Sequence, residues 1–241
     1  MAARIDVSAD PAALAQRVAQ WIVDLACATP GRFAIALSGG STPKRLYGLL
    51  SAPPLRDQMP WQRAHLFWGD DRFVPWDSPD SNYGMASEAM ISQVPIPPEN
   101  IHGIPFTGSP ADAAREYERT LQSYYGSDRL DPARPLFDIV LLGMGPDGHT
   151  ASLFPGKPAL GERQRWAVDV PEPGLNPIVP RVTLTYPALD SAKSMAFVAA
   201  GADKMEMMRR ALAGDRELPS ARIAPVGELV WFVDRAAHGD A

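Results

Sequence analysis

The 241-residue chain has little of what marks secreted, membrane-spanning or disulfide-bonded proteins. Its one cysteine, Cys27, excludes an intramolecular disulfide and suits a reducing compartment. No apolar run is long enough to span a membrane, and the first residues lack the apolar core of a signal peptide. We therefore expect a cytoplasmic protein with no membrane segment. Because Cys27 stands at helical spacing among apolar residues, we expect its side chain to be packed inside.

Histidine and blocks of like charge are also scarce. The chain has four histidines, no Cys/His cluster and no His-Glu-x-x-His spacing, so we expect no metal centre. The net charge is −5, and acidic and basic residues are interspersed along the chain. This pattern contains no block of basic residues that would indicate binding to nucleic acid or to an anionic membrane. A small molecule is therefore the expected partner.

What the chain does have is a regular alternation of short apolar runs with amphipathic stretches. We expect strands at residues 32–37, 65–68, 136–142, 166–170, 181–186, 195–200 and 229–233. We expect helices at residues 11–28, 43–50, 81–93, 109–126 and 203–213. No repeat or long linker divides the chain, and its length suits one α/β domain. The pattern predicts a single domain over residues 1–241, doubly wound and Rossmann-like, with a mainly parallel sheet and helices on both faces.

One stretch, residues 136–156, joins a buried strand to a turn rich in glycine. The apolar run ends at Gly143, and Asp147 and His149 follow within the turn. Ligands of open α/β sheets bind at the carboxyl ends of strands, so this pair is a candidate site. His149 is the candidate general base, since imidazole titrates near neutral pH, although a turn histidine bonded to backbone is the alternative. Asp147 either orients His149 or caps a short helix of about two turns that ends at Pro155.

Another strand, residues 32–37, leads into a loop that suits a phosphate. The loop residues Ser38, Gly39, Gly40, Ser41 and Thr42 supply bare backbone N–H groups, hydroxyls and the positive end of a helix. A helix dipole is worth only about 0.3–1 kcal/mol, so a cation must assist. The loop lacks the Gly-Lys-Ser/Thr ending of a Walker motif. A plain glycine turn that begins a helix is the alternative.

Charged residues near other strand ends complete the candidate site. Asp70, Asp71 and Arg72 follow the strand at 65–68, and Arg72 can grip a phosphate or hydroxyls with its fork; a solvated ion-pair cluster is the alternative. Lys204 follows the strand at 195–200 and is a candidate phosphate cation, or an exposed helix lysine. Arg181 opens a strand after a proline-rich loop and has the same two interpretations.

The spacing Gly143-x-Gly145-x-x-Gly148 formally matches a dinucleotide fingerprint, but we do not assign a nucleotide here. The fingerprint needs a long helix after the turn, whereas Pro155 and Gly156 end this one early. Asp147 would also place a negative charge against the pyrophosphate.

Four motifs taken together resemble the 6-phosphogluconolactonase family over nearly the whole chain. They are Leu37-Ser38-Gly39-Gly40-Ser41-Thr42-Pro43, Trp68-Gly69-Asp70-Asp71-Arg72, Ser81-Asn82-Tyr83, and the run from Gly143-Met144-Gly145-Pro146-Asp147-Gly148-His149 through Thr150-Ala151-Ser152-Leu153-Phe154 to Pro155-Gly156. The resemblance implies the fold of sugar-phosphate isomerases and hydrolysis of 6-phospho-D-glucono-1,5-lactone without metal or organic cofactor. It also implies that Asn82 and Gly145 contact substrate. One departure is that Asp70-Asp71-Arg72 stands where the family more usually has Asp-Glu-Arg.

Glucosamine-6-phosphate deaminase is the nearest alternative, because it shares the glycine loop and the Gly-x-Gly-x-Asp-Gly-His core. Deaminases carry a carboxylate for ring opening where this chain has Phe154, and Asp-Glu-Tyr where it has Asp70-Asp71-Arg72. An apolar ring cannot shuttle a proton, so the resemblance favours hydrolysis. A non-catalytic sugar-phosphate sensor is the other alternative. We expect a monomer or a weak homo-oligomer.

Overall fold

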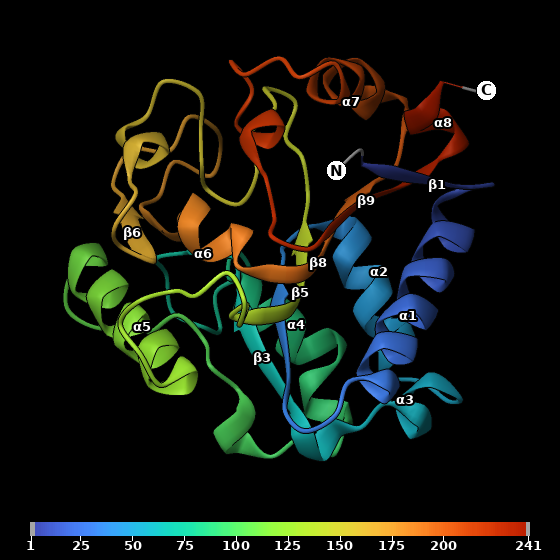
Figure 1. The fold of residues 1–241 in the computed structure, drawn as a ribbon, viewed down its shortest axis with the longest axis horizontal. Coiled ribbons are helices and arrows are strands. Elements are labelled where there is room, and N and C mark those ends of the chain that lie inside the picture. The colour runs from blue at the N-terminus through green and yellow to red at the C-terminus, as the bar shows by residue number, and fades with distance from the viewer. Residues whose placement is uncertain (1–2, 240–241) are drawn as a thin grey trace.

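A central sheet of six parallel strands organises the computed structural model, which describes residues 3–239 (Figure 1). The strand order is β1-β9-β8-β5-β2-β3, and each neighbouring pair is parallel. The strands are β1 (Arg4–Ser8), β2 (Phe33–Leu37), β3 (Ala64–Trp68), β5 (Phe137–Leu142), β8 (Ala192–Ala199) and β9 (Glu228–Asp234). The predicted doubly wound, mainly parallel α/β fold is therefore confirmed. The edge strand β1 was not among the predicted strands.

A small antiparallel sheet lies beside the main one and was not predicted. Its order is β4 (Asp70–Arg72), β7 (Arg181–Leu184) and β6 (Ala167–Val170). The runs at 166–170 and 181–186 were correctly identified as strands, but the sequence did not assign them to a sheet of their own. Gly69 joins the two sheets, since its N–H donates to Leu37 O at 2.8 Å and its carbonyl accepts from Leu184 N at 2.8 Å.

Helices cover the sheets, with α1 at the right of Figure 1 and α5 beside β6 at the left. They are α1 (Pro11–Ala28), α2 (Ser41–Leu50), α3 (Leu55–Gln58), α4 (Asn82–Ala89), α5 (Pro110–Tyr125), α6 (Tyr186–Asp190), α7 (Met205–Leu212) and α8 (Arg235–His238). Short-range signals set their ends. Asp10 caps α1 by accepting from two backbone N–H groups at 2.9 Å, and Ser109 caps α5, which stops at Gly126 with φ 80°.

Two predicted helices differ in the structure. The helix predicted over 81–93 ends at Ala89, because Met90 leaves helical geometry (φ −146°, ψ −57°) before a 3-10 turn. The short helix predicted after Gly148 is absent: residues 149–156 form successive turns, and Ala151 takes a left-handed φ of 47°. Side chains with a Cβ rarely adopt this conformation, and it is incompatible with a right-handed helix.

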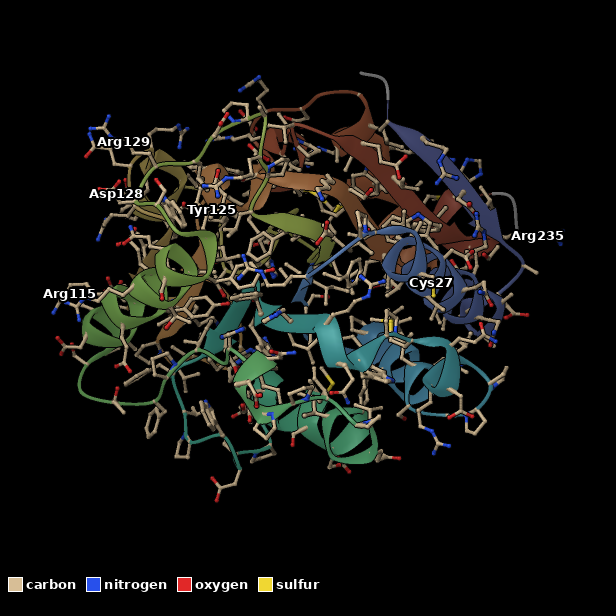
Figure 2. All side chains as sticks on the ribbon, turned by 60° about the horizontal axis from the view of Figure 1, so that its bottom comes forward. Cys27, Arg115, Tyr125, Asp128, Arg129 and Arg235 are labelled. Atoms are coloured by element: carbon tan, nitrogen blue, oxygen red, sulfur yellow. The ribbon has the colours of Figure 1, made fainter. Side chains whose placement is uncertain are left out.

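The predicted burial of Cys27 is wrong. The residue is exposed, and its Sγ lies 3.4 Å from Gln58 O; Figure 2 shows it on α1. The buried face of α1 reaches the neighbouring residue, Ala26, but does not include Cys27. Among the helices of residues 3–239, none is long and apolar enough to cross a membrane.

A pair of histidines packs in an aromatic cluster beside β3. His65 Nδ1 and His102 Nε2 lie 3.1 Å apart, and the His102 ring stacks on Phe67 with centroids 4.4 Å apart. Burial, and then the neighbouring His65, lowers the pKa of His102 to about 4. Burial and then Arg32 lower the pKa of His65. The folded protein therefore holds both rings neutral at pH values where free histidine is protonated.

This pair should make part of the stability dependent on pH. Below about pH 6.5 the unfolded chain binds a proton at residue 102 that the folded chain does not take up until about pH 4. The contribution of His102 is thus fully present above pH 6.5 and is lost as the pH falls toward 4. We expect His102→Gln to lose less stability than the wild type between pH 7 and 4.5, by on the order of 1 kcal/mol after solvent screening.

Thermal unfolding at several pH values measures this difference. The comparison must be between variant and wild type, because burial raises the pKa of Asp71 to about 6 and makes its contribution run in the opposite direction. Parallel curves for His102→Gln and wild type would contradict the prediction.

Candidate functional site

The order of the strands places a crevice between the ends of β2 and β5. From β2 the chain passes to β3 on one side of the sheet, and it later returns to β5 on the other side of β2. The loops that leave β2 and β5 therefore diverge, and ligands of open α/β sheets bind at such a switch point. The loop beginning at Ser38 and the turn beginning at Gly143 meet there.

A pocket at this switch point gathers most of the predicted site residues. Those that line it are Ser38, Gly39, Gly40, Asp70, Arg72, Asn82, Gly145, His149 and Arg181. Gly143, Met144 and Ala151 also line it and were not predicted as site residues. Gly143 and Met144 lie inside the recognised motif, so their signal was available. Ala151 lies in the same motif, and its left-handed backbone could not be predicted from the sequence.

Four predicted residues do not line the pocket. Ser41 and Thr42 form the first turn of α2, directly after the lining residue Gly40. Asp147 reaches the pocket only through His149. Lys204 forms an ion pair with Asp203 at 3.1 Å, in a 3-10 turn after β8. The roles predicted for these four residues stay predictions.

Two buried tyrosines fix the strand ends that lead into the pocket. Tyr47 of α2 donates to Ser38 O at 2.8 Å and accepts from Ser38 N at 3.0 Å. Tyr117 of α5 makes the same pair of bonds with Trp68, at 2.8 Å each. Each hydroxyl satisfies a backbone donor and acceptor where the strand's own ladder stops. Both tyrosines look like ordinary apolar helix positions in the sequence, which is why this function was missed.

The glycine of the β2 loop allows an asparagine to approach the backbone. A Cβ at Gly39 would lie 1.9 Å from Asn82 Oδ1, so no side chain fits there. Asn82 Nδ2 donates to Asp70 O at 3.0 Å, and Asp70 Oδ2 accepts from Ser152 Oγ at 2.6 Å. These contacts tie the β2 loop, β4 and the turn after β5 together around one pocket.

Asp71, the residue that departs from the usual family motif, is used structurally. Its carboxylate is 2 % exposed and accepts from the backbone N–H groups of Arg72, Asn82 and Tyr83 at 2.7–2.9 Å. Burial raises its pKa to about 6 although these hydrogen bonds lower it. The shorter carboxylate therefore still anchors the start of α4 and places Asn82 at the pocket.

The turn after β5 brings Asp147 and His149 together. His149 Nδ1 lies 2.5 Å from Asp147 Oδ1, and the same oxygen accepts from His149 N at 3.1 Å. Burial raises the pKa of Asp147, but the hydrogen bonds from His149 outweigh it and the net pKa is lowered. An ionised Asp147 holds the proton on Nδ1, so Nε2 is the free nitrogen of the ring.

The same turn is shaped by close packing against the imidazole. Gly145 N donates to His149 O at 2.9 Å, and a Cβ at Gly145 would lie 2.0 Å from His149 Nδ1. The ring also packs against Phe154, whose centroid is 4.5 Å away and whose side chain is fully buried. Close contacts with Gly145 and Phe154 thus hold the imidazole of His149. No helix follows the turn, so a dinucleotide phosphate would find no helix N-terminus here.

Two arginines face one another across the small sheet. Arg72 of β4 pairs with Arg181 of β7 in the antiparallel register, and both line the pocket. Like charges directly opposite one another destabilise a sheet. The pKa of Arg181 is lowered, mainly by burial. Asp70 raises this pKa, whereas the positive charge of Arg72 lowers it further. An anion bound between the two guanidinium groups would relieve this repulsion.

Unpartnered polar atoms point to the same position. Ser38 Oγ, Arg72 Nε and Arg181 Nε are buried without a hydrogen-bond partner among the described residues. Buried polar groups are nearly always hydrogen-bonded in folded proteins. All three residues line the pocket, so a ligand with several acceptor oxygens would satisfy them together. A phosphorylated sugar has this chemistry. Within residues 3–239, no group of three or more His, Cys, Asp or Glu side chains could hold a metal ion.

Comparisons with known proteins identify the relatives of this chain. Residues 9–231 match the family described as glucosamine-6-phosphate isomerases/6-phosphogluconolactonase. The chain is 44 % identical to 6-phosphogluconolactonase of a Nostoc species, over 98 % of this chain and 97 % of that protein. It is 39 % identical to the Synechocystis 6-phosphogluconolactonase, over 98 % of both. The crystal structure of 6-phosphogluconolactonase from Thermotoga maritima superimposes with a TM-score of 0.82 at 31 % identity, covering 96 % of this chain and 99 % of that one.

Proposed function

This chain belongs to the family of glucosamine-6-phosphate isomerases and 6-phosphogluconolactonases, and we propose that it hydrolyses 6-phospho-D-glucono-1,5-lactone to 6-phospho-D-gluconate. This is the second step of the oxidative pentose phosphate pathway. The family includes two chemistries, isomerisation with deamination and lactone hydrolysis, so the site must distinguish them.

The contact between His149 and Phe154 favours hydrolysis. Ring opening of an aminosugar needs a carboxylate beside the histidine, and the deaminase motif places it where this chain has Phe154. Here that position is a fully buried ring packed on the imidazole at 4.5 Å. Lactone hydrolysis requires only a base, a water molecule and stabilisation of the developing negative charge. His149 with Asp147 supplies the base.

In the proposed mechanism, His149 takes a proton from water as the water oxygen attacks C1 of the lactone. Asp147 keeps the Nδ1 proton in place, so Nε2 accepts the proton and later donates it to the departing ring oxygen. The 6-phosphate is held by the loop beginning at Ser38 and by Arg181, with Lys204 adding charge at longer range. Arg72 or a backbone N–H of the Gly143–Gly145 turn meets the carbonyl oxygen; one such donor is typically worth about 2.7–4 kcal/mol.

Acid release from freshly generated lactone tests the proposal. The purified protein should accelerate the release well above the rate in buffer, and it should release no ammonia from glucosamine 6-phosphate. A rate equal to that in buffer would overturn the lactonase assignment. Ammonia release would assign the deaminase activity instead.

We further propose that the protein acts in the cytoplasm as one domain and as a monomer or weak homo-oligomer. The exposed thiol of Cys27 is compatible with a reducing compartment. One contiguous hydrophobic core includes residues of both sheets, among them Phe137 and Val182, which supports a single folding unit.

A further inference from the structure

A second pocket, of about 420 Å³, lies outside the candidate site and shares no lining residue with it. Three arginines line it: Arg163 follows a 3-10 turn at Pro158–Gly161, and Arg216 and Arg222 belong to one segment after α7. The remaining wall comes from α6 and its start, with Tyr186, Pro187 and Asp190. A volume of this size is typical of pockets that bind small molecules.

Two of these guanidinium groups, those of Arg163 and Arg222, are held by backbone carbonyl groups. Arg163 Nη1 donates to Leu160 O at 2.8 Å, and Arg222 Nε donates to Arg216 O at 2.5 Å. In the described part of the chain, no carboxylate oxygen lies within ion-pair distance of any of the three. The neighbouring Arg210, by contrast, pairs with Asp215 at 2.7 Å. Positive charge held by carbonyl groups and left unpaired is suited to bind an anion.

Asp190 gives the pocket one acceptor as well. Its Oδ1 accepts from Ala224 N at 2.9 Å, and burial raises the pKa of this carboxyl to about 6 although that bond and Arg163 lower it. The ring of Tyr186 forms a flat wall, with Arg163 above it at 5.6 Å. A fitting ligand has several negative charges and a hydroxyl or amino donor for Asp190. Phosphate esters of sugars and nucleosides combine these features.

The segment that carries two of these arginines also supports the turn of His149. Between Arg216 and Arg222, Ser220 N donates to Gly148 O at 3.0 Å. The Leu218 side chain packs so closely on Gly148 that a Cβ there would lie 2.7 Å from Leu218 Cδ2. A ligand that draws Arg216 and Arg222 together therefore acts on the residue next to the proposed base.

We propose that this pocket, defined by Arg163, Arg216, Arg222 and Asp190, binds a multiply charged phosphorylated small molecule and that the segment 216–222 transmits its binding to the turn of His149. The binding is independent of the proposed lactonase function, whereas the effect on turnover rests on it. The expected kinetic effect is a change in kcat, since a ligand that only competed at the candidate site would change KM alone.

Isothermal titration calorimetry with ADP and with inorganic pyrophosphate tests the binding. We expect both probes to bind the wild type, and Arg216→Ala or Arg163→Ala to weaken binding by about tenfold or more. Arg235→Ala is the matched control, because Arg235 lies on α8 at the right edge of Figure 2 and lines neither pocket. Tighter binding of ADP would show that the nucleoside is recognised, and equal binding would show that the phosphates alone are recognised.

Arg72→Ala separates the two pockets. Binding that persists in Arg72→Ala and is lost in Arg216→Ala belongs to the second pocket. Binding lost in Arg72→Ala but kept in Arg216→Ala and Arg163→Ala belongs to the candidate site and overturns the proposal, as does no binding of either probe at 10 mM. Circular dichroism of each variant checks folding. An unchanged kcat in the presence of bound probe overturns the coupling, and a wild type without lactonase activity overturns the proposed function while the calorimetric result stands.

Discussion

Replacing His149 by alanine should lower kcat for lactone hydrolysis by about 10²–10⁴-fold, the usual contribution of a positioned general base. The KM should change little, because the phosphate contacts proposed for Ser38 and Arg181 remain. The loss in kcat is expected because His149 lines the pocket and Asp147 holds its Nδ1 at 2.5 Å, which leaves Nε2 to act as the base. Acid release under initial-rate conditions, measured against the spontaneous rate, gives both constants.

The control for this variant is His238→Ala in α8, which should retain the wild-type kcat. Asp147→Asn adds a second comparison, since an amide in place of the carboxylate no longer fixes the Nδ1 proton and should also lower kcat. Equal rates for His149→Ala and wild type would remove this histidine from the mechanism and leave the lactonase activity to other pocket residues.

Gly145→Ala should lower kcat by about 10²-fold without removing any functional group. The added Cβ would lie 2.0 Å from His149 Nδ1 and Cε1, so the imidazole must move. Displacement of a catalytic group by about 1 Å can cost this factor in rate. The same movement strains the hydrogen bond between Asp147 and His149, because the imidazole that must move also packs against Phe154.

Gly48→Ala in α2 is the matched control, because its Cβ would meet nothing within 4 Å. Alanine is also the better helix former by roughly 0.5–1 kcal/mol, so this variant should be at least as stable as the wild type. Kinetics and thermal unfolding of both variants separate a displaced histidine from a general loss of stability. A Gly145→Ala enzyme with wild-type kcat would show that the imidazole position in the free protein is not the reactive one.

Much of the site could be predicted because short stretches of sequence determine where strands end and turns begin. The apolar run before Gly143 and the glycines after it place His149 at a carboxyl edge, and the loop after Leu37 is placed there in the same way. Strands that alternate with helices are expected to be parallel, so the ends of these two strands are expected at the same edge of the sheet. This inference needs no knowledge of any contact. The motifs around Asp70 and Asn82 carried the resemblance that assigned the remaining residues to the same pocket.

What could not be predicted depends on partners far away in the chain. A strand's sequence shows its faces but not its neighbour. The separate sheet of β6 and β7, and the position of Arg72 opposite Arg181, could therefore not be predicted. The two bonds from Tyr117 to Trp68 likewise join residues 49 positions apart. The turn after Gly148 was mistaken for a helix because its left-handed residue, Ala151, is one that favours helices when tested alone.

The sequence by itself determined the α/β class, the capped starts of α1 and α5 and the pair Asp147 and His149, because periodicity, capping and glycine sterics act within a few residues. Only the tertiary structure decided that a separate antiparallel sheet brings Arg72 to Arg181, that Gly145 and Phe154 pack against the imidazole, and that the segment 216–222 supports Gly148. These features come from register and packing between distant segments, whose free energy depends on contacts that no local pattern specifies.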